Sequence, residues 1–490
     1  MGRNFAFVTF SQVITQVLAF VVSVSVARDL GVDLYGLFVF GFAFPSWFLW
    51  LVSFELDTVV AVEVSADRSK AGSYLTAVTL LRIPFALVAV VILWVSVRLV
   101  ITDAFAQLVT LILGAASILS TYASLYRTMF RAYERLEFAA LVVVVERTIA
   151  TFAILLLLVL GFGLLPIALV YVLTTIIALV LSLVILKSRF VWFTPKIEFS
   201  TMLNILKKSV PFAMEAIATT FLYSAGPLLA TVLGSSAETG KFNAAFSLVL
   251  AFLAPLAVYH TVVLPSLSRL HREKPESMAK VVYKSQKLCF LVGLPVVLGG
   301  AFFSGQIITF VYGSAFAEAA QSFEILVIVI ATTTLNIGLG AALAASGRQR
   351  LNLGISIAGT LTNVIVCFAL IPSMGHVGAA WAFLAAEIVM VVPSRLLAGQ
   401  FIGRLHMFEV VSRPLVAGAA MLFVLSALPN LSLFGGIGTG ATIYFLVLMA
   451  IGGLSKEDRE LIREMIQGVL LRGERTETAS TDAAESSDVR

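Results

Sequence analysis

The sequence predicts an all-α polytopic membrane protein of about fourteen transmembrane helices, arranged as two parallel six-helix lobes plus two C-terminal helices. Three observations predict this fold class. The chain is 60% hydrophobic and 12% charged, whereas soluble domains average about 25% charged residues. Apolar stretches close to the ~20 residues that cross a bilayer recur along its whole length. Reading these stretches as spans sorts the Lys and Arg residues to one side of the membrane.

The spans are the apolar runs between polar segments. They cover residues 5–27, 36–56, 74–97, 104–125, 138–160, 164–186, 210–233, 241–264, 288–311, 323–346, 351–371, 377–400, 412–428 and 433–452. The longest internal segments between them, 187–209 and 265–287, are too short for a soluble domain. The first span is followed by Ala27-Arg28-Asp29-Leu30-Gly31 and lacks a cleavage-site pattern, so we interpret it as a retained helix.

The distribution of positive charge fixes the orientation. All but five of the 33 Lys and Arg residues fall in the N-terminal segment, in every second loop or in the tail. The five exceptions are Arg28, Arg98 and Lys241 on the other side, and Arg82 and Arg147 within spans. Because basic loops stay in the cytoplasm, both termini are predicted to be cytoplasmic. We interpret the net charge of +5 as a result of this bias and expect no nucleic-acid partner.

A repeated motif predicts that the two halves are duplicated. Ala27 to Gly31, followed by Gly36-Leu37-Phe38, recurs as Ala230 to Gly234, followed by Gly240-Lys241-Phe242. Both copies join two spans, and both halves begin on the cytoplasmic side, so the repeats are parallel. The predicted units are an N-lobe over 1–209, a C-lobe over 210–405 and a final pair of spans over 406–454.

The tail, residues 455–490, begins with the capping-box-like Ser455-Lys456-Glu457-Asp458, and apolar residues at helical spacing follow. It predicts an amphipathic cytoplasmic helix that lies on the membrane surface or packs on the cytoplasmic loops. From Gly473 onward, Ser, Thr, Glu and Asp indicate disorder.

Catalytic and metal-binding signatures are missing from the sequence. It has no zinc-protease, Cys-x-x-Cys, nucleophile-elbow or dinucleotide-binding pattern, and Cys289 and Cys367 lie at or in different spans. The segment from Gly234 to Lys241 has the wrong spacing for a phosphate-binding loop. We therefore predict that the protein is not an enzyme and has no metal site and no cofactor.

Two arginines within spans are the first candidates for substrate binding, because a charge at the bilayer centre costs about 2.5–3.5 kcal/mol. Arg147 lies beside Glu146 in the fifth span, and Arg82 lies about two turns inside the third. Each has a structural alternative. Arg147 and Glu146 could hold helices together by ion pairing, and Arg82 could extend its side chain to the cytoplasmic surface.

A second pair of cations, Arg28 and Lys241, occupies similar depths in the two halves. Two cations beside one path are suited to a phosphate group, although both could simply anchor helices at the interface. Glu55 and Asp57, near the inner end of the second span, could balance arginines in a central cavity.

Five polar residues in the second half are candidates for coupling to H⁺ or Na⁺. They are Glu215, His260, Asn336, Asn363 and Glu387. Carboxylates and other oxygen ligands at membrane depth suit a proton or sodium site, whereas hydrogen bonds between helices are the alternative role.

At this point an ordered series of motifs resembles a known family. The motifs are Ala27 to Gly31 with Tyr35-Gly36, Leu56-Asp57-Thr58, Tyr312-Gly313, Ala345 to Arg348, Asn363, Ile371-Pro372 and Gly375 to Ala380. Over about residues 5–450 the chain resembles polysaccharide flippases of the multidrug, oligosaccharidyl-lipid and polysaccharide exporter superfamily.

The resemblance implies a two-lobed transporter of the plasma membrane that translocates isoprenoid-(pyro)phosphate-linked oligosaccharides to the external face by alternating access. Its implied partners are this substrate, membrane lipids and the glycosyltransferase, polymerase or oligosaccharyltransferase machinery of surface polysaccharide or glycoprotein assembly. It also implies that cavity cations, here Arg28, Arg82 and Arg147, engage the linking phosphate. An ion-coupled small-molecule or multidrug exporter of the same superfamily is the alternative.

Overall fold

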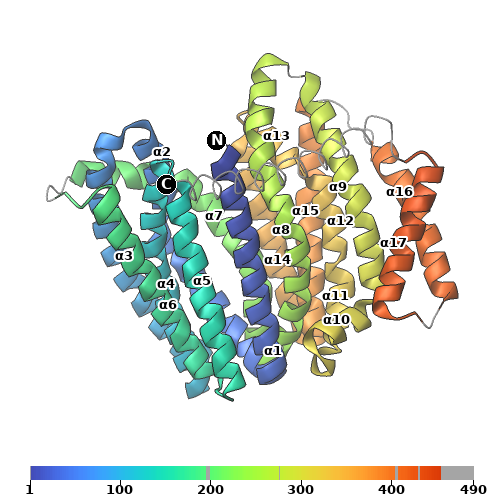
Figure 1. The fold of residues 1–490 in the computed structure, drawn as a ribbon, viewed down its shortest axis with the longest axis horizontal. Coiled ribbons are helices and arrows are strands. Elements are labelled where there is room, and N and C mark those ends of the chain that lie inside the picture. Colours follow the sequence, from blue (N-terminus) through green and yellow to red (C-terminus); the bar gives the residue numbers. More distant parts are fainter. Residues whose placement is uncertain (1, 195–198, 275, 403–406, 429–430, 454–490) are drawn as a thin grey trace, which may run out of the picture.

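The computed structural model describes residues 2–194, 199–274, 276–402, 407–428 and 431–453. Every regular element within these ranges is a helix. The all-α prediction is therefore confirmed for this part of the chain, and Figure 1 shows how the helices are arranged.

The first half contains six long predicted spans in five long helices. Its elements are α1 (Gly2–Ser53), α2 (Leu56–Ala66), η1 (Arg68–Lys70), α3 (Ala71–Val100), α4 (Ala104–Ala132), α5 (Leu136–Val159) and α6 (Leu164–Arg189). The first two spans share α1, which breaks at Gly31 (φ 78°, ψ 179°), a conformation open almost only to glycine. The segment after the second span, expected to be a loop, instead forms α2 and η1.

The second half contains several interrupted helices. Its elements are α7 (Phe199–Leu233), α8 (Ser236–Glu273), α9 (Glu276–Phe302), α10 (Ser304–Tyr312), η2 (Ser314–Phe316), α11 (Ala319–Leu326), α12 (Ile328–Asn336), α13 (Leu339–Ala345), α14 (Gln349–Met374) and α15 (His376–Ile402). The ninth predicted span is divided between α9 and α10, and the tenth between α11, α12 and α13. The final pair of spans is α16 (Met407–Ala427) and α17 (Leu433–Ala450), and the predicted tail helix lies outside the described residues.

Length and composition support the predicted crossings. Thirteen candidate membrane spans occur in the described residues, and the first, Ser11–Ser53, has 43 residues. At ~1.5 Å per residue a helical segment of that length reaches about 65 Å, enough to cross a ~30 Å hydrocarbon core twice around the Gly31 break. The chain is therefore a multi-pass membrane protein with the predicted set of spans.

Side-chain caps fix several helix starts at the predicted span ends. The Asp103 carboxylate accepts a hydrogen bond from the Ala106 N–H at 2.7 Å, and the Ser235 and Ser432 hydroxyls accept from N–H groups three residues later. Such caps satisfy backbone donors that the first turn of a helix leaves free.

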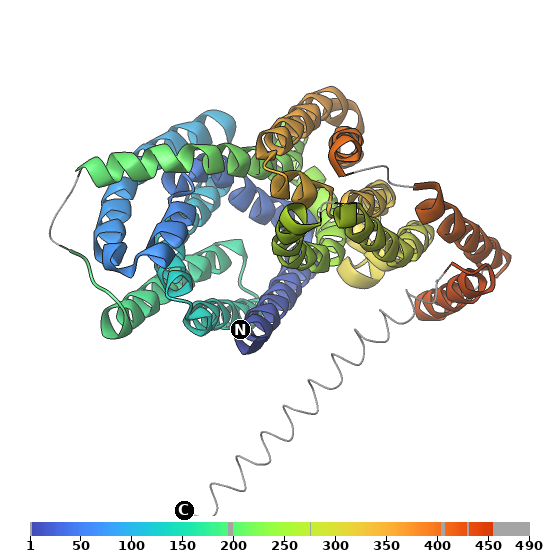
Figure 2. The ribbon, with the colours of Figure 1, turned by 90° about the horizontal axis from the view of Figure 1, so that it is seen from above.

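The bundle has two ends that matter for the site. We call the end that carries the start of α1, η1 and the link between α8 and α9 the basic face, because Arg68, Lys70, Arg272 and Lys274 lie there. The opposite face carries residues 28–36, 234–241 and 313–318. Figures 1 and 2 show α2 to α6 on one side, most of the second half on the other, α1 between them, and α16 and α17 at the far edge.

The two halves share one apolar core. It joins residues of α1, such as Tyr35 and Phe38, to Phe242 and Phe246 of α8 and to Tyr312 of α10. A smaller core holds α2, α3, α4 and α6 together near the basic face. The outer surfaces remain apolar, with Leu87 and Leu99 of α3 63% and 81% exposed, as expected for helices that face lipid.

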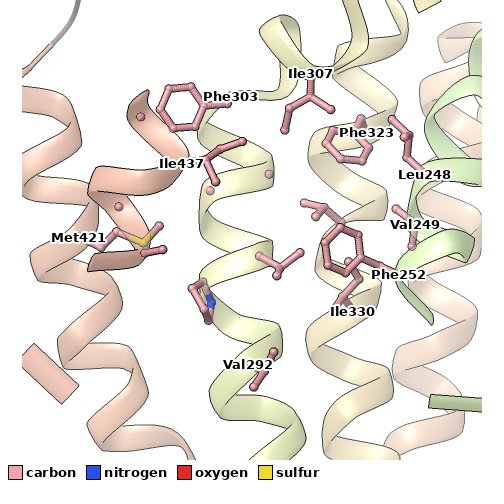
Figure 3. A pocket seen from close by; sticks show the side chains of 18 of the residues that line it. Leu248, Val249, Phe252, Val292, Phe303, Ile307, Phe323, Ile330, Met421 and Ile437 are labelled. Atoms are coloured by element: carbon pink, nitrogen blue, oxygen red, sulfur yellow. The ribbon is translucent and has the colours of Figure 1, made fainter. Parts of the chain in front are cut away.

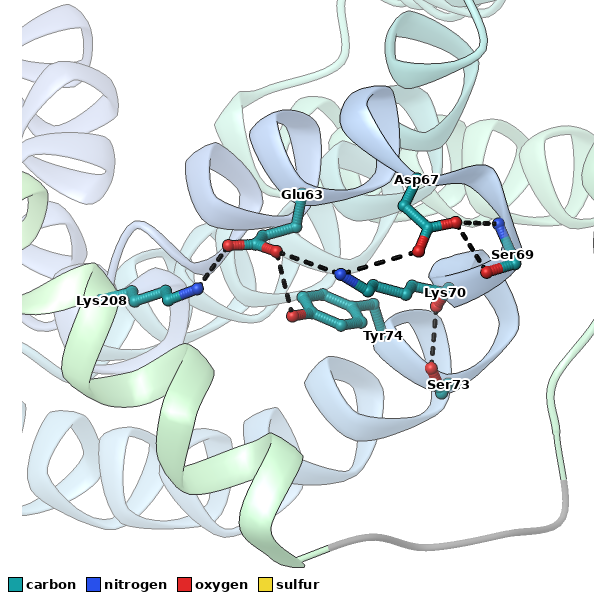
Figure 4. Close-up of polar contacts among 7 residues, drawn as sticks. All are labelled: Glu63, Asp67, Ser69, Lys70, Ser73, Tyr74 and Lys208. Carbon is teal, nitrogen blue, oxygen red and sulfur yellow. Dashed lines mark hydrogen bonds and ion pairs between the residues drawn. The ribbon is translucent and has the colours of Figure 1, made fainter.

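Helix α7 connects the halves. It packs on α2 and α3 of the first half and on α14 and α8 of the second, so the predicted lobe boundary at 209/210 falls inside one 35-residue helix. In the first half of α7, Lys208 donates a hydrogen bond to the Glu63 carboxylate of α2 (Figure 4). The same carboxylate accepts a hydrogen bond from Tyr74 Oη at 3.5 Å and forms an ion pair with Lys70 Nζ at 3.8 Å. This network ties α7 to the first half at the basic face.

Candidate functional site

Arg82 lies in the interior of the first half, and both of its terminal nitrogens have protein partners. Its side chain is 0% exposed, its Nη2 lies 2.7 Å from Asp57 Oδ1, and its Nη1 donates to the Thr121 carbonyl of α4. The third nitrogen, Nε, is buried and has no partner among the described residues. An arginine without exposed surface pins α2, α3 and α4 together and offers no group to a ligand in this conformation.

Arg127 and Arg131 of α4 add two further cations to the first half, and sequence analysis missed both as site residues. Arg127 Nη1 lies 3.5 Å from Glu146 Oε2 of α5, and Arg131 Nη2 donates to Thr128 Oγ1 at 3.0 Å. We expected both arginines in a cytoplasmic loop, whereas α4 continues to Ala132 and carries them one turn apart on one helix face. The apolar run alone underestimated the length of the helix.

Arg147 is an exposed cation on the inward face of α5. It lies seven residues after Ala140 and seven before Ile154. Because seven residues are close to two helical turns, the three side chains lie along one stripe of the helix. Ala140 and Ile154 are 7% and 0% exposed. Phe152 and Leu156, on the lipid side, are 69% and 59% exposed. Arg147 is therefore an exposed charged side chain on the otherwise buried stripe of α5.

Arg147 makes no ion pair or hydrogen bond with the described residues, because Glu146 pairs with Arg127 instead. Arg147 interacts electrostatically with Arg127 of α4 and with Tyr171 of α6. The ring of Tyr171 packs on Phe38 and Phe42 of α1. Of the four predicted cations it is the one that the described structure leaves free for an anion.

The repeated glycine motifs meet at the opposite face. A Cβ added to Gly36 would lie 1.7 Å from the Ser236 carbonyl oxygen, and one added to Gly240 would lie 2.3 Å from the Val32 carbonyl oxygen. Val32 and Ser236 each stand four residues before the glycine of their own motif. The contact is therefore reciprocal, as for two equivalent surfaces related by an approximate two-fold axis. It supports the predicted duplication and closes the opposite face.

Arg28 and Lys241 also lie at this closure, and both have protein partners. Arg28 Nε donates to the Val311 carbonyl at 2.7 Å and its Nη2 donates to that of Phe310, so it caps the end of α10, where the helix dipole favours a cation. Lys241 Nζ pairs with Glu318 and, at 3.3 Å, with Glu238. The hydrogen bond from Lys241 holds the pKa of the Glu318 carboxyl below its ordinary value.

A buried tyrosine completes the contact between the halves. Tyr35 of α1 is 0% exposed and its hydroxyl accepts a hydrogen bond from Asn243 Nδ2 of α8 at 2.8 Å. Its ring packs on Tyr312 and Phe316 of the second half. The sequence motif contained Tyr35 but gave no sign of these partners, which are more than 200 residues away.

Of the predicted ion-coupling residues of the second half, Glu215 and Asn363 have hydrogen-bond partners. Glu215 of α7 accepts from Gln349 Nε2 at 3.1 Å, and Asn363 of α14 donates to the Leu222 carbonyl at 2.7 Å. His260 lies in α8, and its side chain is outside the described part of the structure.

Glu387 and Asn336 differ from these. Glu387 of α15 is 7% exposed and forms no ion pair or hydrogen bond within the described ranges. Asn336 ends α12, and its Oδ1 is buried without a partner among the described residues.

Glu55 of the first half stands in a left-handed conformation (φ 50°) between α1 and α2, and its carboxylate accepts a hydrogen bond from Thr58 Oγ1 at 2.6 Å. The structure brings Asp57, but not Glu55, to an arginine.

An apolar pocket of about 380 Å³ lies between the second half and the final helix pair. Its walls come from α8 to α12, α16 and α17, and they include Phe252, Phe323, Met421 and Ile437 (Figure 3). Phe252 and Ile437 are 55% and 48% exposed, so the pocket opens on the lipid-facing surface. Such a wall binds hydrocarbon and provides no polar contact.

Together these features separate three kinds of surface: a cluster of cations in the first half, a closed contact between the halves, and an apolar lateral pocket. Within the described residues, no group of three or more His, Cys, Asp or Glu residues could hold a metal ion. The arrangement suits the binding of an amphiphile with an anionic head.

Comparisons with known proteins agree with this geometry. Residues 1–271 match the family described as polysaccharide biosynthesis protein. No curated protein gives a significant match to the chain.

Solved structures of low sequence identity share the fold. A structure of the lipid II flippase MurJ in an inward closed conformation is 14% identical, covers 93% of this chain and 99% of its own, and has a TM-score of 0.73. An inward-facing multidrug resistance MATE family transporter of the MOP superfamily is 16% identical, with 79% and 94% covered and a TM-score of 0.64. A MOP superfamily transporter from Pyrococcus furiosus is 14% identical, with 81% and 94% covered and a TM-score of 0.55.

The family match covers more than half of the chain, and the fold matches extend over both halves and, for MurJ, almost the whole chain. The family predicted from the ordered motifs is thereby confirmed. The chain belongs to the polysaccharide biosynthesis protein family and has the fold of the MOP superfamily transporters.

Proposed function

We propose that the protein is a flippase that moves an isoprenoid-(pyro)phosphate-linked oligosaccharide from the cytoplasmic to the external face of the plasma membrane. The observation that carries this proposal is Arg147, an exposed cation without a partner among the described residues, on the buried stripe of α5. We propose that it faces a wet interior. An arginine held at membrane depth without a protein counter-ion is costly unless an anion or water meets it. A phosphate linked to a lipid provides that anion, and Arg binds phosphate through two parallel hydrogen bonds.

The remaining parts of the substrate also find suitable surroundings. A saccharide needs the wet interior, because burying each unpaired hydroxyl in hydrocarbon costs roughly 2–7 kcal/mol. The isoprenoid chain needs apolar contact, and the pocket beside α16 and α17 offers an apolar wall that opens toward lipid. Arg127 lies close enough to Arg147 for their charges to interact, Arg131 follows one turn later on α4, and both add positive charge for the phosphate.

Alternating access accounts for the closed contact at the opposite face. Basic loops mark the cytoplasmic side, so the N-terminus and the basic face are cytoplasmic and the glycine contact is external. In this conformation the halves are joined outside by Arg28, Tyr35 and the Gly36 and Gly240 contact. Transport requires that this contact open while the basic face closes. Arg28 and Lys241 then stabilise the inward-facing state rather than bind phosphate.

The driving ion is proposed to be H⁺ or Na⁺, and Glu387 is the principal proton candidate because it is buried within α15 without a counter-charge. The same residue favours the second candidate function, an ion-coupled small-molecule exporter like the MATE transporters that share the fold. The two functions differ in substrate charge. An exporter of cationic drugs needs acidic groups in its cavity, as Glu387 could provide, whereas the unpaired exposed group of the first half is the cation Arg147.

The experiment that tests the proposal measures on which membrane face the lipid-linked oligosaccharide accumulates when the gene is deleted. An external glycosidase reports accessibility in intact cells or spheroplasts. Build-up of protected, cytoplasmic-facing substrate is expected. Normal sidedness of the oligosaccharide together with reduced efflux of cationic dyes would replace the flippase with the exporter.

Arg147 provides a test of the site itself. Arg147→Ala is expected to reduce flipping in proteoliposomes by at least roughly tenfold, the effect of losing one charge-assisted contact, with membrane insertion unchanged. Arg147→Lys should restore only part of the rate, because an ammonium lacks the two-pronged geometry. Arg135→Ala at the start of the same helix is the matched control, since that residue is exposed and pairs with Glu137. Wild-type flipping by the Arg147→Ala protein would remove Arg147 from the site.

A further inference from the structure

The span formed by residues Ala319–Ala345 is interrupted about a third of the way in from the basic face. Helix α12 ends at Asn336, Ile337 is non-helical (φ −57°, ψ 133°), and Gly338 adopts a left-handed conformation (φ 80°) before α13 begins at Leu339. Only glycine takes this conformation at little cost. Backbone groups freed by such a break need partners, because membrane hydrocarbon supplies none.

Helix α9 covers the break with two side chains on one face. Val282 packs on Gly338, where an added Cβ would lie 3.6 Å from Val282 Cγ2. One turn later, Gln286 is 0% exposed and its Nε2 donates to the Leu335 carbonyl at 2.6 Å. The amide of Gln286 is therefore held against the last turn of α12.

Two side-chain oxygens at this place have no donor. Gln286 Oε1 and Asn336 Oδ1 are both buried and without a hydrogen-bond partner among the described residues. Leaving a buried acceptor unsatisfied is costly, and most buried polar atoms in proteins are paired. Both oxygens lie at the C-terminal end of α12, where the helix dipole contributes negative potential.

We propose that the break between α12 and α13 binds a monovalent cation, Na⁺, through Gln286 Oε1, Asn336 Oδ1 and carbonyl oxygens of the last turn of α12. Neutral oxygen ligands at an unwound helix suit Na⁺. Divalent Ca²⁺ and Mg²⁺ favour carboxylate ligands, and no described cluster of acidic residues lies here. The bound ion would join α9 to α12 and fix the geometry of the interrupted span. The site is distinct from Glu387, and its occupancy does not depend on the proposed transport function.

The test measures the thermal stability of the purified full-length protein in NaCl and in choline chloride at equal ionic strength. Na⁺ is expected to raise the melting temperature in a saturable manner, because a ligand that binds only the folded state stabilises it. Gln286→Leu, which removes both the amide and its oxygen, is expected to abolish this Na⁺-specific increase.

Gln107→Leu is the matched control. Gln107 of α4 also donates its amide to a backbone carbonyl, that of Ile101 at 2.7 Å, but its oxygen is not among the buried unpaired atoms. This variant should lose a similar hydrogen bond and keep the full response to Na⁺.

Three outcomes would overturn the proposal. If wild-type protein melts at the same temperature in both salts, the two oxygens bind water only. If Gln286→Leu retains the response, the ion binds elsewhere. Should Gln286→Leu fail to fold, Asn336→Asp tests the same site: its carboxylate is expected to lower the half-saturating Na⁺ concentration by about tenfold, the effect of strengthening one contact by ~1.4 kcal/mol. An unchanged concentration would refute the site.

Discussion

At the scale of single residues, the partner of a charge decides its role more than its depth does. Arg82 and Arg147 both lie within predicted spans, yet Arg82 is enclosed by Asp57 and a backbone carbonyl, whereas Arg147 is exposed on an interior stripe. A buried charge that has a partner becomes expensive when that partner is removed. The two arginines should therefore respond to mutation in different ways.

Arg82→Leu is expected to destabilise the protein by about 3 kcal/mol, because it leaves the Asp57 carboxylate without its counter-ion in the interior. Thermal unfolding of the detergent-solubilised protein measures the loss. Arg135→Leu, which removes an exposed pair with Glu137, should cost less than about 1 kcal/mol. A stable Arg82→Leu protein that has lost transport would instead return Arg82 to the substrate site.

Sequence and structure differ most where distant residues meet. Apolar length and charge sorting predicted every span, because both depend on local composition and on the thickness of the membrane. The pairing of Arg82 with Asp57, and of Arg28 with the carbonyls of residues 310 and 311, has no local signature. The break at Gly338 could be suspected from its glycine, and the one at Phe303 from the Ser304-Gly305 that follows it. The interruption at Val327 could not, since it is an ordinary apolar residue in an apolar run.

At the scale of helices, the reciprocal glycine contact depends on the absence of two side chains. The Ala27–Gly31 repeat predicted that Gly36 and Gly240 are equivalent, but not that they face one another. Carbonyl oxygens of Ser236 and Val32 occupy the space that a Cβ would need. Two helices approach this closely only where glycine removes the steric barrier.

Gly36→Ala is therefore expected to weaken the closed contact at the opposite face. Overpacking typically costs about 1–3 kcal/mol, so the open population should rise roughly tenfold. The measurement is the labelling rate of a cysteine introduced at Ser247, one layer below the contact, by a membrane-impermeant thiol reagent in a background without Cys289 and Cys367. Gly163→Ala, on the same face with nothing within 4 Å, is the control. Equal labelling of both variants would contradict the role of this contact as a closure.

The docking of α7 on α2 should depend on pH through Glu63. The hydrogen bond from Lys208 holds the pKa of the Glu63 carboxyl below its ordinary value. Because the pKa of Glu63 is lowered in the folded protein, the Glu63–Lys208 contact stabilises the docking fully at pH values above the ordinary glutamate pKa of about 4.3. This stabilisation is lost as the pH falls through the lowered pKa and the carboxylate is protonated. Spin labels on α2 and α7 should report a constant distance from pH 7 to about 5 and a broader distribution below about 4. Glu63→Gln should show the broad distribution at every pH; a pH response that survives this substitution would assign the titration to another group.

At the scale of the whole molecule, the two halves meet in one conformation that joins them firmly at the opposite face and through α7. The shared core around Tyr35, Phe242 and Tyr312 lies at that face, while the exposed Arg147 lies deeper toward the middle of α5. A substrate that enters from the basic face would therefore reach the cation while the far end is closed. Transport then requires the contacts of Gly36 with Ser236 and of Gly240 with Val32 to separate in every cycle.

Locking that contact should stop the cycle. In a background without Cys289 and Cys367, Val32→Cys and Ser236→Cys joined by a short bifunctional, reducible thiol reagent are expected to abolish flipping in proteoliposomes, and reduction should restore it. The matched pair, Ser304→Cys with Glu324→Cys, lies within the second half, where the native side chains are 2.7 Å apart, and its cross-link should leave flipping near the uncross-linked rate. Because the first cross-link bridges the halves and the second does not, the comparison isolates their relative motion. Undiminished flipping with Val32 and Ser236 joined would show that the halves do not separate at the opposite face and would exclude alternating access through this contact.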